Sequence, residues 1–486
     1  MNGIKLETSL RARSVLGYRR AIRTATPPIL RKASSTTENA SHVCDVCIVG
    51  GGIVGTALAS ALSTSSLKVA LIEAGNLFQI PENNGNTYSN RVSSLTGSTI
   101  RFLKQIDAWN AIEANRSTPY RTMQVWDAIG KGKIQFNAPP GEEAIAHIVE
   151  NNHLQAALVS TLTASQQTKI FNQSKVNSIV SGPLKHGGYG WPVVRLEDGR
   201  TIQSRLLSFA KVGADGANSR VRTFAEIDSN GWDYAQMGLV ATLRLVPTDK
   251  GNDTAWQRFL PSGPIALLPL DNEHSSLVWS IPPKLAPLLR SLPEREFAEI
   301  VNVAFTGSWP DLQFLTSQIG DDGSASANFV EEARWSRKRA AIGEPKPPTI
   351  VGVQHKSRAS FPLRLRNSES YAKSRVALIG DAAHSVHPLA GQGLNLGIAD
   401  AESLAEVIKE GIEVGQDLGH IHLLENYTRA RFTSNLAMMK SIDSIGKLFG
   451  TENGPVVTLR SFGLDVTNSM GPIKDRIMNF AGRSII

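Results

Sequence analysis

The chain has 486 residues, of which 41% are hydrophobic and 19% are charged. This composition is typical of a globular protein, and the length favours two interleaved domains over one simple core. The net charge is +8, but residues 1–43 alone hold a surplus of six positive charges and leave +2 for the rest. We therefore expect no nucleic-acid partner. No run of about 18 uninterrupted apolar residues occurs, so any membrane contact should be peripheral.

The first 40 residues are rich in Arg, Ser and Thr, with Leu10, Leu16 and Ile22 interspersed among the arginines. This pattern is typical of a mitochondrial transit peptide that forms a basic amphipathic helix. A disordered basic tail is the alternative. We expect cleavage before Cys44.

Cys44 and Cys47 are the only two cysteines of the chain and have CxxC spacing. They lie in an apolar run that predicts a strand, and residues three apart on a strand point to opposite faces. The sequence therefore predicts two core cysteines, with neither a disulfide nor a metal site.

A strand, a tight turn and a helix are predicted at the start of the globular part. The apolar run from Val43 to Val49 leads into Gly-Gly-Gly-Ile-Val-Gly and then a run of small apolar residues. Gly50 permits the turn, Gly52 lets backbone amides approach a pyrophosphate, and Gly55 allows close packing of helix on strand. The partial positive charge of the helix N-terminus suits a diphosphate.

A second predicted strand, Leu67 to Ile72, ends at Glu73. A carboxylate in this position can bind the ribose hydroxyls of an adenosine moiety. An ordinary strand-to-helix turn is the alternative for the glycine motif alone. The two features together predict a dinucleotide site but do not separate NAD from FAD.

Two further glycine motifs follow apolar, strand-like segments. Asp215 lies in Gly-Ala-Asp-Gly-Ala-Asn after residues 204–212, although Asp-Gly is also a common turn pair. The strand-like run from Val376 to Ile379 precedes Gly-Asp-Ala-Ala-His, and a Gly-Gln-Gly loop then opens a predicted helix from Leu394 to Lys409.

These three motifs, in this order and at these separations, resemble the flavoprotein aromatic hydroxylases, the family that includes para-hydroxybenzoate hydroxylase. The resemblance implies an α/β fold, with a Rossmann-like FAD-binding domain of the para-hydroxybenzoate hydroxylase type, an interleaved β-sheet substrate domain and C-terminal helices. It also implies FAD as a non-covalent cofactor.

The third motif carries most of the flavin contacts that the resemblance implies. Asp381 matches the acid that binds the ribityl chain of FAD. Gly393, Leu394 and Asn395 match the residues whose backbone amides meet the flavin pyrimidine ring. A helix that begins there directs its dipole at the ring positions where reduced flavin gathers negative charge.

Three more residues are carried over from the family. Asp215 matches the acid near the pyrophosphate and the nicotinamide approach, and Arg91 matches an arginine that reaches the FAD phosphates. Asn151 is a weaker match. His384 and His387 lie beside the expected flavin, but hydrogen bonding or packing is the favoured interpretation, so no catalytic side chain is predicted.

Within this family, the chain is most similar to the subgroup of ubiquinone-biosynthesis hydroxylases. The similarity to this subgroup lies in segments 255–264, 266–270 and 380–400. It implies hydroxylation of a polyprenylated 4-hydroxybenzoate-type ring by molecular oxygen through a flavin C4a-hydroperoxide. It further implies reduction by a ferredoxin and ferredoxin reductase, a complex with other ubiquinone-biosynthesis enzymes, and peripheral association with the matrix side of the mitochondrial inner membrane.

A basic cluster on the predicted surface is a candidate docking site for an acidic electron carrier, with an ordinary solvated loop as the alternative. Its members are Arg334, Arg337, Lys338 and Arg339.

Alternating segments from about Trp232 to Gln354 predict a sheet that covers the flavin, interrupted by a helix from Pro293 to Thr306 and a surface insertion from Glu331 to Pro348. Trp256, Phe259 and Trp279 are candidate pocket residues or core residues. The predicted boundaries are residues 1–40 for the transit peptide, 41–120, 146–230 and 356–425 for the FAD-binding domain, 121–145 and 231–355 for the substrate sheet, and 426–486 for the C-terminal helices.

The C-terminal region has Ile473, Ile477 and Phe480 at helical spacing with basic residues around them. A docking surface for a membrane or a partner protein is one interpretation, and packing against the FAD-binding domain is the favoured one.

Three other functions remain open from the sequence. A flavin halogenase fits half of a Trp-x-Trp-x-Ile-Pro motif, but Leu277 replaces the first tryptophan. A squalene-epoxidase-like enzyme should carry apolar anchoring helices, which the sequence does not predict. A non-catalytic flavin-stabilised scaffold would show no turnover.

Overall fold

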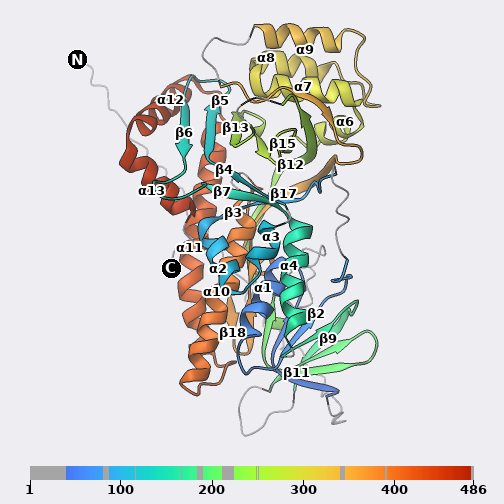
Figure 1. The fold of residues 1–486 in the computed structure, drawn as a ribbon, viewed down its shortest axis with the longest axis vertical. Helices are drawn as coiled ribbons and strands as arrows, with labels where there is room; N and C mark the ends of the chain where they lie inside the picture. The colour runs from blue at the N-terminus through green and yellow to red at the C-terminus, as the bar shows by residue number, and fades with distance from the viewer. Residues whose placement is uncertain are drawn as a thin grey trace, which may run out of the picture. The chain divides into compact units, whose positions relative to one another are not determined.

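The computed structural model describes residues 40–79, 87–114, 116–165, 167–182, 190–210, 224–247, 249, 251–339, 345–388 and 391–482. Asp215 and nearly all of the predicted transit peptide lie outside the described residues. The described chain forms an eight-stranded sheet, a nine-stranded sheet and a three-stranded sheet with helices packed around them (Figure 1).

The eight-stranded sheet contains the predicted first and second strands. Its members are β1 (His42–Val49), β2 (Val69–Ile72), β8 (Thr168–Phe171), β9 (Val176–Ser181), β10 (Pro192–Leu196), β11 (Thr201–Phe209), β18 (Ala372–Lys373) and β19 (Val376–Leu378). β1 pairs in parallel with β2 and β11, β2 pairs in parallel with β8, and β11 pairs in parallel with β19. Buried parallel strands of this kind are nearly continuous apolar runs, as Val69–Ile72 is.

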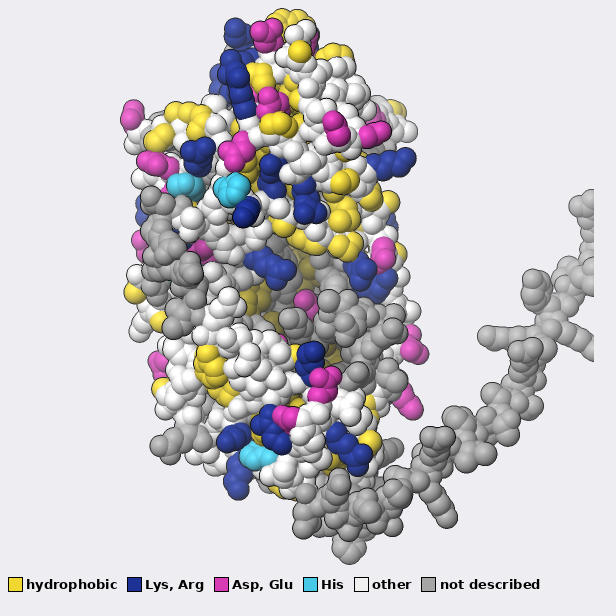
Figure 2. Space-filling view, turned by 90° about the vertical axis from the view of Figure 1, so that its right-hand side faces the viewer, with side chains coloured by type: hydrophobic (Ala, Val, Ile, Leu, Met, Phe, Trp, Pro, Cys, Tyr) yellow, Lys and Arg dark blue, Asp and Glu magenta, His cyan; other side chains and the backbone are white. Residues whose placement is uncertain are grey.

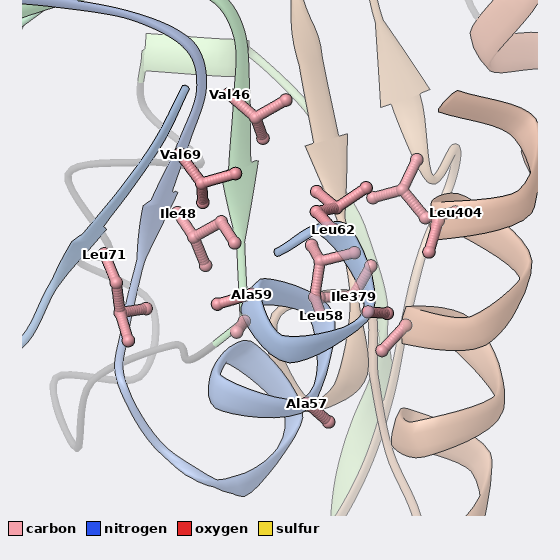
Figure 3. Packing of buried hydrophobic residues seen from close by; sticks show 14 of the residues in the cluster. Val46, Ile48, Ala57, Leu58, Ala59, Leu62, Val69, Leu71, Ile379 and Leu404 are labelled. Atoms are coloured by element: carbon pink, nitrogen blue, oxygen red, sulfur yellow. The ribbon is translucent and has the colours of Figure 1, made fainter. Parts of the chain in front are cut away.

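Helices cover this sheet: α1 (Ile53–Leu62), α4 (Asn151–Ala164) and α10 (Gln392–Glu413). α1 is apolar on almost every side, which is typical of a helix enclosed by other elements. Figure 3 shows Leu58 and Leu62 of α1 between Ile48 of β1 and Leu404 of α10. The core of the FAD-binding part is therefore built around this one short helix.

The nine-stranded sheet is the observed counterpart of the predicted substrate sheet. Its members are β5 (Thr122–Asp127), β6 (Lys133–Asn137), β12 (Ser229–Leu245), β13 (Thr254–Leu260), β14 (Gly263–Pro269), β15 (His274–Ile281), β16 (Ile350–Val353), β17 (Ala359–Ser368) and β20 (His384–Ser385). β17 pairs with β12, although its residues lie in a range that the sequence assigns to the FAD-binding domain.

Four helices pack on one face of the nine-stranded sheet: α6 (Leu285–Ser291), α7 (Glu294–Thr306), α8 (Trp309–Ser317) and α9 (Phe329–Lys338). Trp279 of β15 is buried among the residues of this helical layer. Its neighbour Ser280 points to the opposite face, where it meets His387. The helical layer and the third glycine motif therefore lie on opposite faces of the sheet.

The smallest sheet consists of β3 (Val92–Thr96), β4 (Ser117–Tyr120) and β7 (Ala146–Glu150), with α2 (Gly97–Gln105) and α3 (Trp109–Glu113) beside it. In Figure 1 these strands lie between the two larger sheets.

Three helices end the described chain: α11 (Ile421–Phe449), α12 (Gly454–Ser469) and α13 (Gly471–Gly482). Arg460 of α12 donates to both carboxylate oxygens of Asp127 at the end of β5, at 2.7 and 3.0 Å, and both side chains are fully buried. Arg460 also donates to the carbonyl oxygens of Leu448 and Thr451. This arginine therefore joins α12 to the nine-stranded sheet and to the end of α11. None of the described helices has both the length and the apolar character that crossing a bilayer requires.

The predicted strands between Trp232 and Gln354 are confirmed by β12, β14 and β15, and the predicted helix from Pro293 to Thr306 is confirmed by α7. The predicted surface insertion from Glu331 is wrong in its first part, because residues up to Lys338 belong to α9. Phe329, Ala333 and Ser336 bury one face of this helix, while its charges lie elsewhere.

Cys44 and Cys47 are buried and form no disulfide, as predicted. The Cys44 thiol, together with burial, raises the pKa of Cys47 well above its usual value.

Candidate functional site

The ends of four parallel strands define the candidate site. β1 leads into Gly50, β2 into Glu73, β11 into Ala210 and β19 into Gly380. Because parallel strands end at the same edge of a sheet, these loops are brought together from distant parts of the sequence. This edge is where open α/β sheets bind their ligands.

Two of the predicted glycines are required by the fold itself. Gly50 has a φ of +104°, which favours glycine. A Cβ at Gly55 would lie 2.0 Å from the carbonyl oxygen of Gly50 and 2.8 Å from the Cβ of Ala210. Any side chain there would push α1 away from the turn.

Gly52 has neither of these reasons to be glycine. It precedes α1 with an ordinary φ of −66°, and an added Cβ would meet no protein atom within 4 Å. The space in front of the helix N-terminus is therefore open, and the N-terminal amides of α1 can face an anionic group there. This geometry fits a diphosphate.

Glu73 lies at the turn, as predicted, but its carboxylate is already engaged by the chain. One oxygen accepts from the amide of Gly51 and the other from the amide of Gly75, both at 2.7 Å. Each carboxylate oxygen can accept a second hydrogen bond. The two amides fix the carboxylate in place beside the glycine turn.

The structure brings Arg91 and Asn151 together. The amide of Asn151 donates to the carbonyl oxygen of Arg91 at 3.0 Å, and Ser93 donates to the Asn151 side chain at 2.7 Å. The Arg91 side chain is exposed. The sequence analysis missed Gln155, whose amide group donates to the carbonyl oxygen of Gly51 and to the Thr56 hydroxyl, both at 2.9 Å. Its position one helical turn after Asn151 is the only signal that the sequence offers.

The third motif forms two tight turns. Gly380 and Gly391 have φ values of +55° and +61°, and Gly391 directly precedes α10. Asp381 lies in a short 3₁₀ helix and is exposed. The N-terminus of α10 and the Asp381 carboxylate therefore both lie at the site edge of the sheet.

The first turn of α10 contains the three residues predicted to meet the flavin ring. Gly393 and Leu394 are half-buried. The side chain of Asn395 is fully committed to the protein: it accepts from Thr99 at 2.8 Å and donates to the carbonyl oxygen of Ser94 at 2.8 Å. Only the backbone of Asn395 remains for a ligand, in agreement with the predicted role of backbone amides.

Comparison with known proteins decides which ligand this geometry serves. The family described as FAD binding domain matches residues 43–306 and 318–440. The mitochondrial ubiquinone biosynthesis monooxygenase COQ6 of Xenopus tropicalis is 42% identical over 91% of this chain and 94% of its own length. The human protein of that name is 39% identical over 91% of this chain and 93% of its own length. The chain belongs to this family of FAD-dependent monooxygenases.

Solved structures with low identity share the fold. A p-nitrophenol 4-monooxygenase from Pseudomonas putida superposes with a TM-score of 0.64 at 17% identity, over 92% of this chain and 100% of that one. A probable FAD-dependent monooxygenase from Pseudomonas aeruginosa gives a TM-score of 0.61 at 21% identity, over 88% of this chain and all of its own. The predicted para-hydroxybenzoate hydroxylase type of fold is confirmed.

A buried charge network supports the loop of the third motif, residues 380–388, which is termed the flavin-side loop. Asp400 of α10 is 0% exposed, and one of its oxygens accepts from the amide of Gly380 at 3.1 Å and lies 2.6 Å from Nε2 of His384. Its other oxygen accepts from Arg431 at 2.9 Å and from Asn435 at 3.0 Å. Burial alone would raise the pKa of Asp400, but the interactions with His384, Arg431 and Asn435 outweigh it and lower this pKa below its usual value. A single carboxylate thus ties the third motif to α10 and α11.

His387 lies on the same loop but has a different environment. It is buried, with Nε2 3.3 Å from Oε1 of Gln236 and 3.5 Å from Oγ of Ser280, and its ring is edge-on to Tyr234. Burial lowers its pKa to about 4. His387 is therefore neutral at physiological pH and joins the flavin-side loop to β12 and β15 of the nine-stranded sheet.

The aromatic candidates belong to the protein interior. Trp279 and Trp256 pack against the helical layer formed by α6–α9. Phe259 stacks on Phe449 of α11, with 4.1 Å between the ring centroids. The core interpretation of these side chains is the one that the structure favours.

The basic cluster on α9 lies on the face of the nine-stranded sheet that points away from the third motif. Arg334 and Arg337 each bond to Glu299 at 3.0 Å, and Arg339 bonds to Asp311 at 2.5 Å. The solvated-surface interpretation fits these residues, because acidic neighbours engage three of them on the face of the sheet opposite the third motif.

We predict that Asp400→Asn weakens both folding and FAD binding. The neutral side chain leaves Arg431 without its buried counter-charge, which should cost about 3–5 kcal/mol of unfolding free energy. It also releases the loop that carries Asp381. Asp127→Asn is the matched control, because Asp127 is an equally buried carboxylate paired with an arginine elsewhere. Urea unfolding of the apoprotein should show a loss in both variants, and FAD titration should show weaker binding in Asp400→Asn alone. Equal FAD affinity in the two variants would contradict this role.

We predict that His387 makes the protein less stable in acid. Its folded pKa lies below the usual value, so the unfolded state binds the proton first and stability falls as pH drops from about 6.5 to about 4. At about pH 5 this contribution should be about 2 kcal/mol relative to neutral pH. His387→Gln should lack this part of the pH dependence in denaturant unfolding, whereas His422→Gln, at an exposed position of α11, should keep it. If the unfolding free energies of the wild type and His387→Gln depend on pH in the same way, the assigned role of His387 is wrong.

Proposed function

We propose that the chain is a mitochondrial FAD-dependent monooxygenase that hydroxylates the aromatic ring of a polyprenylated 4-hydroxybenzoate-type precursor in ubiquinone biosynthesis, with molecular oxygen as co-substrate. The observation that carries this proposal is the identity of 42% to a ubiquinone biosynthesis monooxygenase across almost the whole of both chains. The alternatives of a halogenase, an epoxidase and a non-catalytic scaffold have no comparable support. Leu277, which replaces the first tryptophan of the halogenase motif, is a fully buried core residue of β15.

FAD would be held non-covalently at the strand ends and would supply the redox and oxygen chemistry of the reaction. The open space before α1, bounded by Gly50, Gly52 and Gly55, fits its diphosphate, and Glu73 fits the adenosine ribose. Arg91, Asn151 and Asp215 are assigned to the phosphate side, and Asp381 to the ribityl chain. The first-turn amides of α10 at Gly393, Leu394 and Asn395 are assigned to the ring.

The protein's own contribution to the reaction is placement and exclusion of water. The N-terminus of α10 places partial positive charge beside the flavin ring. The nine-stranded sheet covers the loop that bears His384 and His387, through the pairing of β20 with β17. A neutral His387 can accept or donate a hydrogen bond near the substrate without adding a charge to the pocket.

The finer partners and location are also proposals. Peripheral association with the matrix side of the inner membrane and a complex with other ubiquinone-biosynthesis enzymes would give access to a polyprenylated substrate. A ferredoxin and its reductase would supply electrons, and an acidic carrier of this kind needs basic residues near the flavin edge.

We propose a second docking site for an acidic carrier where the end of α6 meets the turn at residues 354–357. A cavity of about 430 Å³ there is lined by Arg290, His355, Lys356 and Arg358, with Glu294 as the one acid. The turn at residues 354–357 contacts the segment that carries Arg91, through Tyr88 and Asn90. Figure 2 views this side of the molecule, where the surface is hollowed between its upper and lower parts and Lys and Arg side chains gather beside the hollow.

We predict that Gly52→Val and Asp381→Ala both lower FAD occupancy. The valine should displace the diphosphate without harming the apoprotein, because its Cβ meets no protein atom. Loss of a ribityl hydrogen bond to Asp381 should weaken FAD binding about tenfold or more. Flavin absorbance after purification measures occupancy, and acid precipitation should release the chromophore. Gly454→Val is the control, since its Cβ is equally unobstructed at the start of α12. Normal flavin content in Gly52→Val would refute the diphosphate assignment.

We predict that NADPH bleaches the flavin rapidly only when ferredoxin and ferredoxin reductase are present, and that the polyprenylated phenol is then hydroxylated. Lys356→Glu combined with Arg290→Glu should slow this reduction about tenfold by repelling the acidic carrier. Arg334→Glu combined with Lys338→Glu, on the far face of the sheet, should not. Bleaching by NADPH alone at the rate of turnover would exclude the indirect route, and turnover with no hydroxylated product would exclude the proposed function.

A further inference from the structure

Exposed hydrophobic side chains are concentrated in the C-terminal helices. Of the nineteen large hydrophobic residues that are exposed in the described part of the chain, eight lie between residues 445 and 477. Leu459 and Phe462 of α12 are 71% and 66% exposed. The eight are Ile445, Leu448, Leu459, Phe462, Val466, Met470, Ile473 and Ile477. Single exposed hydrophobic residues are ordinary on a protein surface, but a concentration of this kind indicates an interaction surface.

α12 contacts the edge strand β6 through two polar side chains. Asp465 accepts from the amide of Lys133 at 3.4 Å, and Asn468 accepts from the amide of Gln135 at 3.1 Å. Arg460 is buried against Asp127. The outward face carries Leu459, Phe462 and Val466 at positions i, i+3 and i+7. A helix face in contact with water normally carries polar residues at such positions.

Few charges lie on α12. Of its two charged residues, Arg460 is buried against Asp127, and Asp465 is exposed and accepts from the amide of Lys133. The apolar surface continues past Met470 to Ile473 and Ile477 on α13, while Phe480 packs inward against the cluster of Leu396, Met438 and Ile442. The sequence-based expectation that all three residues of α13 pack against the FAD-binding domain is therefore wrong for two of them.

The surface lies on a pair of helices at the margin of the molecule. In Figure 1, α12 and α13 form the left-hand margin of the molecule, outside β6. α12 is fixed to the nine-stranded sheet by Arg460, and α13 is fixed to α10 by Phe480. The two helices that carry the apolar surface therefore contact both layers between which the aromatic ring has to lie.

We propose that this surface, defined by Leu459, Phe462, Val466, Met470, Ile473 and Ile477, inserts into the outer layer of a lipid bilayer. The inference rests on the proposed function, because a polyprenylated substrate resides in the bilayer and must reach the space between the two layers. Exposed apolar side chains on two successive helices suit the acyl boundary of a membrane, into which amphipathic helices bury their apolar side, while the exposed Asp475 and Arg476 of α13 would stay at the headgroups.

The test is flotation of the FAD-loaded full chain with vesicles of phosphatidylcholine, which carries no net charge. Neutral vesicles are needed because the basic segment at residues 1–43 would by itself attract anionic lipid. The variant is Leu459→Glu combined with Phe462→Glu. The control is Val414→Glu combined with Phe314→Glu, which places the same charges at exposed hydrophobic positions of α10 and α8.

The wild type and the control should float with the vesicles, and binding should change little with salt because phosphatidylcholine carries no net charge and the contacting side chains are apolar. The Leu459/Phe462 variant should partition at least about tenfold more weakly. Its FAD content should be normal, and it should retain turnover of a short-chain, water-soluble phenol while losing turnover of the polyprenylated phenol in vesicles.

Equal flotation of the variant and the control would overturn the proposal, as would a wild type that does not float. A variant that floats normally but no longer assembles with another ubiquinone-biosynthesis enzyme would assign the surface to a protein partner instead. Absence of hydroxylation of the short-chain phenol by the wild type would count against the proposed function, and the flotation result would stand independently of it.

Discussion

Parallel pairing of β1 with β2 and β11 is the constraint on which the candidate site depends. Parallel strands end at a common edge, so Gly50, Glu73 and Gly380 meet although more than three hundred residues separate the first from the last. The arrangement also requires a small residue where α1 and α10 contact each other. A Cβ at Gly397 of α10 would lie 2.7 Å from Val54 of α1, so the two helices touch where they approach the site. Bulkier residues there would move the N-terminus of α10 away from the glycine turn.

Two buried carboxylates hold the parts of this arrangement that apolar packing alone would leave adjustable. Asp400 connects the loop after β19 to α10 and α11, and Asp127 connects β5 to α12. Burying an ion pair stabilises a fold little in comparison with apolar residues of similar size. Such a pair fixes the position of a helix, because a hydrogen bond to one particular arginine or amide is lost if the helix shifts by a fraction of a turn. The first pair fixes the loop of the third motif at the site edge of the sheet, and the second fixes α12 against the nine-stranded sheet.

The two faces of the nine-stranded sheet contact different parts of the protein. One face is covered by α6–α9, which complete a hydrophobic core, and the other faces the flavin-side loop through residues such as Ser280 and Gln236. β6 at the edge of this sheet would expose unpaired amides, and α12 satisfies two of them with Asp465 and Asn468. These polar side chains contact β6, whereas Leu459, Phe462 and Val466 of the same helix are exposed. Protection of the sheet edge and the proposed membrane surface thus arise from one helix.

The sequence by itself determined the strand, turn and helix around Gly50, the strands before Glu73 and Asp381, and the FAD-dependent hydroxylase family, because these depend on short-range patterns of glycine and apolar residues. Several features were decided only by the tertiary structure. Gln155 meets the glycine turn because α4 packs on α1, and Asp400 gains four partners from two segments, the loop after β19 and α11. The sequence also does not show that this apolar face of α12 points outward, because its apolar residues have the spacing of a core-facing helix. Only the position of β6 shows which side faces inward, and that position depends on strand pairing between residues far apart in the chain.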